Sequence, residues 1–95
     1  MPNLEFDPEQ SSYIIQRGLK SKSLLENEAF LWIVDEQTST NLMQIMACKP
    51  GDDAALKHAH LMQYTLTDLV STLQGYAQAG EAEARVIEML SQEVD

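Results

Sequence analysis

The chain has 95 residues and a net charge of −9, which arises from 15 acidic and 6 basic side chains. This length predicts a single domain, residues 1–95, with a thin core if the chain is alone. The acidic balance disfavours direct binding to nucleic-acid phosphates, because that affinity comes from Lys and Arg side chains. It favours basic protein partners instead.

Residues 1–23 predict an extended arm over residues 1–6 and a short helix over about residues 8–19. Asp7 is a typical capping residue, and Pro8 suits the first position of a helix. A second capping signal, Ser23 with Glu26 three residues later, starts a helix over about residues 24–48. Asn27 is a further capping residue, so a break at that position is the alternative.

The helix over residues 24–48 carries apolar side chains on more than one side, which indicates contacts with two neighbours. Its main stripe comprises Phe30, Ile33, Val34, Leu42, Ile45 and Met46. Its middle, residues 37–41, is polar. These side chains form either an outer face or a polar layer within the seam, which sets register or oligomer number as a buried Asn does in coiled coils.

Residues 49–53 predict a tight turn, in which Pro50 and Gly51 end one helix and Asp52 or Asp53 caps the next. Over residues 53–79, apolar side chains recur every three or four positions, which is typical of one face of a helix. They are Ala55, Leu56, Ala59, Met62, Leu66, Leu69, Val70, Leu73, Tyr76 and Ala77. The short connection predicts an antiparallel αα-hairpin over residues 24–80.

After the hairpin, Gly80 is predicted to cap the helix, and residues 81–95 to form a separate short amphipathic helix through Val94. This helix either folds back onto the hairpin or docks on another subunit. Gly75 is a candidate for a close helix crossing. The apolar stripes are wider than two helices can cover, so we expect an all-α fold that is completed as a helical bundle by oligomerisation.

The sequence contains no recognisable catalytic, cofactor or metal signature, and we expect a protein that is not an enzyme and needs no cofactor or metal. His58 and His60 point to different sides of a helix and lack a Cys or acidic ligand one turn away. Cys48 lies at the negative end of a helix dipole, which opposes a reactive thiolate. A single cysteine indicates a reducing compartment, and no apolar run approaches the ~20 residues that cross a membrane.

The residues expected to contact a second copy or another protein are large and apolar. They are Phe30, Leu31, Trp32, Met43, Met46, Met62, Leu66, Leu69, Leu73 and Tyr76. Our leading hypothesis is therefore a self-associating assembly protein. The acids concentrated after Ser23 favour an alternative, an inhibitor that mimics nucleic acid and occupies a basic groove. A third hypothesis is a small DNA-packaging subunit that uses the helix around Tyr13, Arg17 and Lys22.

One resemblance supports the leading hypothesis. The run Leu24–Phe30 (LLENEAF), a long helix, the turn Lys49–Asp53 (KPGDD) and a second helix ending near Gly80 resemble small helical proteins of tailed bacteriophages. Such proteins are often encoded among virion and head-assembly genes. The resemblance covers residues 24–80 and implies a phage origin and a non-enzymatic assembly or interaction role. We expect the protein in the host cytoplasm, and virion assembly is the most plausible setting. It assigns no site residue.

Overall fold

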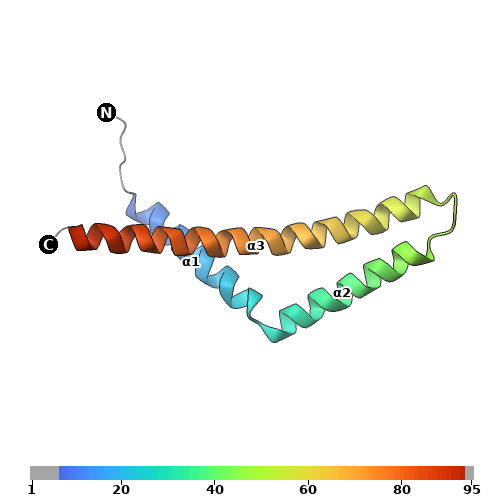
Figure 1. Ribbon diagram of the computed structural model, residues 1–95, viewed down its shortest axis with the longest axis horizontal. Coiled ribbons are helices and arrows are strands. Elements are labelled where there is room, and N and C mark those ends of the chain that lie inside the picture. Colours follow the sequence, from blue (N-terminus) through green and yellow to red (C-terminus); the bar gives the residue numbers. More distant parts are fainter. Residues whose placement is uncertain (1–6, 94–95) are drawn as a thin grey trace, which may run out of the picture. The chain divides into compact units, whose positions relative to one another are not determined.

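The structure is a computed structural model that describes residues 7–93, and within this range it contains helices and no strand. Helix α1 spans Pro8–Leu25, α2 spans Glu28–Ala47 and α3 spans Asp53–Glu93 (Figure 1). The predicted all-α class is confirmed. The arm expected over residues 1–6 and the apolar Val94 lie outside the described residues.

Each helix begins after a polar side chain that caps its first turn. The Asp7 carboxylate accepts a backbone hydrogen bond from that turn at 3.0 Å, and Asp52 does the same at 3.4 Å. The Asn27 side chain accepts one from the backbone N–H of Phe30 at 2.9 Å. These bonds satisfy N–H groups that have no partner inside the helix. The caps at Asp7 and Asp52 are confirmed, as is the break at Asn27.

The turn between α2 and α3 lies where the sequence predicts it. Cys48 follows the last residue of α2, and its backbone N–H donates to the Ile45 carbonyl at 3.3 Å. Gly51 has a φ of 92°, a left-handed conformation that glycine adopts without steric cost. The Asp52 N–H then donates to the Lys49 carbonyl at 3.0 Å, which closes the turn before α3.

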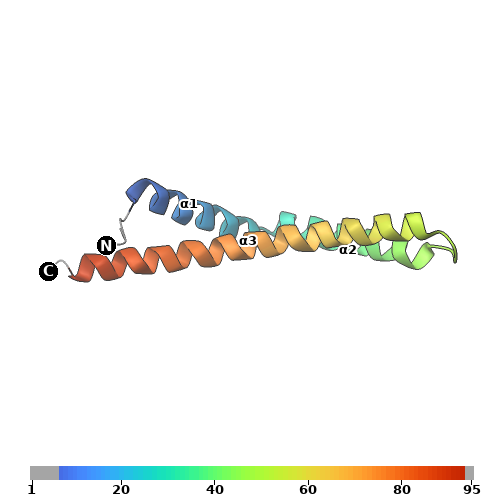
Figure 2. The ribbon, with the colours of Figure 1, turned by 90° about the horizontal axis from the view of Figure 1, so that it is seen from above.

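The described residues divide into two compact units. We call residues 7–24 and 73–93 the terminal unit, and residues 25–72 the central unit. Helix α3 runs without interruption through both units, so each contains one part of it (Figures 1 and 2). The terminal unit pairs α1 with the second part of α3, and the central unit pairs α2 with the first part. A single domain over residues 1–95 stays a prediction.

In the central unit, the buried and half-buried residues of α2 and α3 recur three or four positions apart, and the hydrogen bond between Asn41 and Gln63 joins the two rows. Those of α2 are Phe30, Val34, Gln37, Thr38, Asn41, Ile45 and Cys48, and those of α3 are Leu56, Ala59, Gln63, Leu66 and Val70. This spacing is typical of a coiled-coil seam. The stripe predicted for α2 is therefore wrong at Ile33, Leu42 and Met46, which are exposed. A stripe of apolar residues alone leaves out the polar residues Gln37, Thr38 and Asn41, which lie in the observed seam.

A ladder of amides crosses the middle of this seam. Asn41 is only 1% exposed, and its side-chain NH₂ donates to the Gln63 carbonyl oxygen at 3.0 Å. Its own carbonyl oxygen accepts from Gln37 at 2.8 Å, and Gln63 donates to the Thr67 hydroxyl at 3.4 Å. Burying an amide is costly unless it is hydrogen-bonded, and here it is. Gln37, Thr38 and Asn41 therefore form a polar layer in the seam, whereas Ser39 and Thr40 are exposed; that this layer sets register or oligomer number stays a prediction.

In the terminal unit, α1 and α3 approach closely at two glycines. A Cβ added to Gly18 would lie 2.8 Å from the Cα of Gly80, and Ser11 and Ser21 are buried nearby on α1. The predicted cap at Gly80 is wrong, since this glycine lies inside α3 and its missing side chain makes room for α1. Gly75, proposed for a close crossing, is exposed and has no such neighbour.

Two predicted boundaries are wrong for the same reason. Helix α1 continues past residue 19 to Leu25, and residues 81–93 continue α3 rather than forming a short helix of their own. Ser23 is therefore inside α1, not at a helix start. Contacts between α1 and α3 stabilise both extensions: Lys22 pairs with Glu81 at 3.8 Å, and the Ser11 hydroxyl donates to the Glu83 carboxylate. Of the two arrangements considered for residues after 80, these contacts favour packing within the chain.

Candidate interaction surface

The described part of the chain buries very little apolar side-chain surface. Ala59 is its only fully buried hydrophobic residue, and the largest fully buried side chain is Asn41. Two helices packed side by side bury only one stripe of each, so their remaining apolar side chains face solvent.

The most exposed apolar group lies on α2, on the side opposite its seam. Trp32, Met43 and Met46 are 64%, 69% and 84% exposed, respectively. Successive residues of an α-helix are rotated by about 100° around its axis. Residues 32, 39 and 46 therefore lie almost in line, and residue 39 lies about 200° around the helix from Asn41. Ser39 occupies the middle of this line and is also exposed. We call Trp32, Ser39, Met43 and Met46 the outer face of α2.

The predicted contact residues do not all share one environment. Leu31, Trp32, Met43, Met46, Met62 and Leu69 are exposed, whereas Phe30, Leu66, Leu73 and Tyr76 are half-buried. Leu73 and Tyr76 belong to the terminal unit and the others to the central unit. The structure therefore brings Phe30 and Leu66 into the α2–α3 seam. It leaves the six exposed residues available for contacts outside the chain.

Helix α3 carries further exposed apolar residues that are not among the predicted contact residues. They are Leu61, Tyr64, Val86, Met89 and Leu90. For Leu61 and Tyr64, the signal is the three- and four-residue spacing of the seam from Leu56 to Val70, because positions outside that repeat face away from α2. These residues are more dispersed than the outer face of α2, since they occur in both units.

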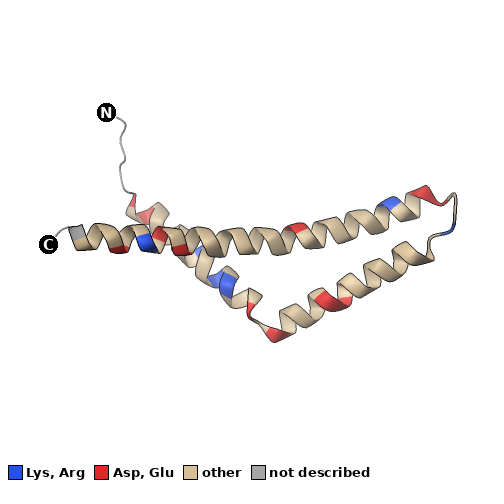
Figure 3. Ribbon diagram, in the orientation of Figure 1, with Lys and Arg blue, Asp and Glu red and all other residues tan. Residues whose placement is uncertain are grey.

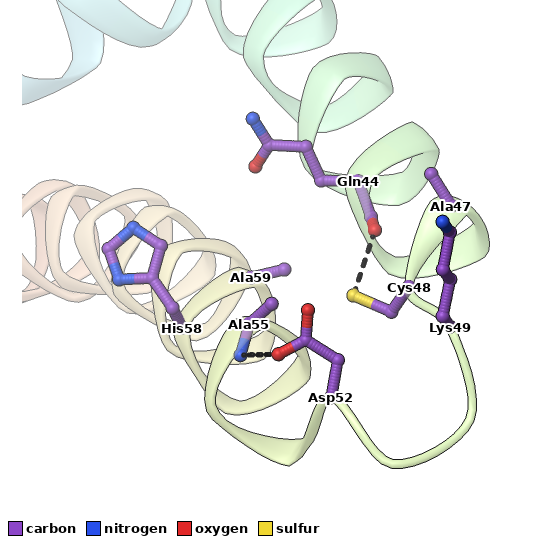
Figure 4. A pocket seen from close by; sticks show the side chains of 8 residues that line it. All are labelled: Gln44, Ala47, Cys48, Lys49, Asp52, Ala55, His58 and Ala59. Carbon is purple, nitrogen blue, oxygen red and sulfur yellow. Dashed lines mark hydrogen bonds between the residues drawn. The ribbon is translucent and has the colours of Figure 1, made fainter.

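A shallow pocket of about 510 Å³ lies beside the turn between α2 and α3. It is lined by Gln44, Ala47, Cys48, Lys49, Asp52, Ala55, His58 and Ala59 (Figure 4). Two of its polar groups are already engaged: the Cys48 thiol donates to the Gln44 carbonyl at 3.1 Å, and Asp52 caps α3. No group of three or more His, Cys, Asp or Glu within residues 7–93 is placed to hold a metal ion. The pocket is therefore part of the turn's local structure.

Arg17 makes a contact that the sequence reasoning missed. Its guanidinium lies 4.0 Å from the centre of the Tyr76 ring and 5.4 Å from that of Tyr13. Such cation–π contacts form when a cation lies within about 6 Å of an aromatic ring centre. The contact joins α1 to the second part of α3. The i to i+4 spacing of Tyr13 and Arg17 is a sequence signal for the contact within α1. No sequence signal points to Tyr76 on α3.

Figure 3 shows the charged residues distributed over all three helices. Between the start of α3 and Gly80, its only acids are Asp53 and Asp68, so this part of α3 carries no continuous row of acidic side chains. Of the basic groups on α1, Arg17 stacks on Tyr76 and Lys22 pairs with Glu81. This leaves Lys20 as the basic side chain of α1 without such a contact in the described structure.

No known protein family, curated protein or solved structure was found to match this chain. The resemblance to phage-encoded proteins therefore depends on the sequence pattern of residues 24–80. Within residues 7–93, none of the helices is both long and apolar enough to span a membrane. The physical properties of the exposed surface are the remaining guide to function.

Proposed function

We propose that this chain is a non-enzymatic assembly protein that works by binding protein, including copies of itself. One observation carries the proposal. Among the hydrophobic residues of the described chain only Ala59 is buried, whereas many large apolar side chains are exposed. Helical proteins of this size commonly complete their core by oligomerisation.

Exposed apolar side chains on α2 support the proposal. Trp32, Met43 and Met46 are each more than half exposed, and apolar side chains that gather on a surface are typical of protein interaction sites.

The setting proposed for this assembly is a virion, in the host cytoplasm where virions form. Its support is the resemblance of residues 24–80 to small helical proteins of tailed bacteriophages. The acidic charge of the chain is compatible with that setting, because it keeps unassembled copies soluble and disfavours direct contact with packaged nucleic acid.

Light scattering after size-exclusion chromatography tests the proposal. We expect a mass that is a multiple of 10.7 kDa at micromolar concentration, and a melting temperature that rises with protein concentration, as it does when folding is coupled to association. A mass of one chain, together with a melting temperature that is independent of concentration, would contradict self-association.

A further inference from the structure

We infer that the second part of α3 binds α1 of a second copy, so that two copies exchange their α1 helices. The inference rests on the proposed function, because it names the surface and the partner of self-association. The surface is the part of α3 that α1 contacts within one chain, and we call it the α1-binding surface. It comprises Tyr76, Ala77, Gly80, Glu81 and Glu83.

The first argument is that the structure shows which helix fits this surface. A Cβ added to Gly18 of α1 would lie 2.8 Å from the Cα of Gly80, and the Arg17 guanidinium lies 4.0 Å from the centre of the Tyr76 ring. Such contacts need α1 and α3, but the two helices can belong to different chains. Exchange of an identical helix retains each contact and is a low-cost route to a dimer.

The second argument is charge complementarity. Helix α1 carries three basic residues and one acid, whereas residues 81–93 of α3 carry four acids and one basic residue. Helix α2 has no Lys or Arg, so it does not match an acidic surface. Lys22 and Glu81 already pair at 3.8 Å across the contact. Complementary charge of this kind selects the partner, and among the three helices it selects α1.

The third argument is that α1 can leave its own α3 without disturbing α2. Only Glu26 and Asn27 join the two helices, and Asn27 caps α2 through the backbone N–H of Phe30. Opening at this connection therefore retains the cap, and short connections favour exchange between copies. Opening also gives water access to the Arg17 Nε, which is buried without a hydrogen-bond partner. Little apolar area is uncovered, because the buried residues of α1 are Ser11, Gly18 and Ser21.

The test uses full-length chains that each keep one cysteine. In a Cys48→Ser background, one variant carries Lys22→Cys and the other carries Glu81→Cys. The side chains of Lys22 and Glu81 meet at 3.8 Å and are both more than half exposed, so losing this ion pair should leave the fold intact. Since each chain holds one cysteine, a short bismaleimide joins positions 22 and 81 only between two chains.

We expect cross-linked dimers when the two variants are mixed and equilibrated at micromolar concentration. Random pairing makes about half of the dimers mixed, and each variant alone should give no cross-link between positions 22 and 81. The matched control replaces Lys22→Cys by Lys20→Cys, which lies about 200° around α1 from position 22 and should abolish the cross-link. Circular dichroism should show the helix content of the parent for every variant.

A chain that carries both Lys22→Cys and Glu81→Cys, again with Cys48→Ser, is the positive control. If this chain does not cross-link at all, α1 does not occupy the α1-binding surface and the inference is wrong. If light scattering shows association but the mixture cross-links no more than the Lys20→Cys control, exchange of α1 is wrong although self-association stands. If every chain remains a monomer up to high micromolar concentration, both this inference and the proposed function are wrong.

Discussion

Replacing Gly18 by Ala tests whether α1 and α3 really touch through their backbones. In an ordinary helix this change is favourable, because Ala is about 1 kcal/mol better than Gly in a helix interior. Here the new Cβ would lie 2.8 Å from the Gly80 Cα and 2.8 Å from the Tyr76 carbonyl oxygen. Both neighbours are backbone atoms, so neither can rotate away as a side chain would.

The expected magnitude follows from these two opposing effects. Overpacking a close contact costs about 1–3 kcal/mol, and backbone neighbours place Gly18→Ala at the upper end of that range. After the gain in helix propensity is subtracted, the net loss of stability is about 1–2 kcal/mol. In a chain of this length each kcal/mol lowers the melting temperature by about 4–8 °C.

Gly75→Ala is the matched control, because a Cβ at Gly75 meets nothing within 4 Å. This variant should gain stability by about 1 kcal/mol. Thermal melts followed by circular dichroism, at one fixed protein concentration, compare the two variants with the parent. If Gly18→Ala raises the melting temperature as Gly75→Ala does, the close approach of α1 and α3 does not exist in solution.

Three further substitutions test the polar layer, a cap and the turn. Asn41→Ala leaves Gln63 without its buried partner and should cost about 1–3 kcal/mol in urea denaturation; a loss below the experimental error would show that the amide ladder is absent. Asn27→Ala removes the cap of α2 and should cost about 1 kcal/mol, whereas Asn27→Asp should retain most of the stability. Gly51→Ala forces a residue with a Cβ into a φ of 92° and should cost about 1–3 kcal/mol. An unchanged melting temperature would exclude this turn conformation.

The helix starts and the turn could be predicted because their chemistry is local. Asp7 and Asp52 cap helices through backbone groups only two or three residues away, and Gly51 supplies the left-handed conformation. Neighbouring residues in the sequence do not decide between a helix start at Ser23 and a helix break at Asn27. Ser23 has capping chemistry too, but contacts of α1 with α3 keep it inside α1.

The extent of α1 and α3 could not be predicted for the same reason. Gly80 resembles a helix cap when only its neighbours in sequence are considered. Its role depends on Gly18, which is far away in the chain but adjacent in the terminal unit. The inner and outer sides of α2 were also ambiguous, because apolar residues occur all around that helix. The regular repeat from Leu56 to Val70 on α3 was the clearer guide to the seam.

The amide ladder at Asn41 also limits how α2 can slide along α3. A slip of one heptad would place Val34 or Cys48 opposite Gln63, and neither side chain offers an amide in exchange. Either heptad slip therefore loses the hydrogen bond between Asn41 and Gln63 that the observed alignment has. A helix of another protein that binds this side of α3 would have to place an amide opposite Gln63. Helices with only apolar side chains at that position are therefore disfavoured.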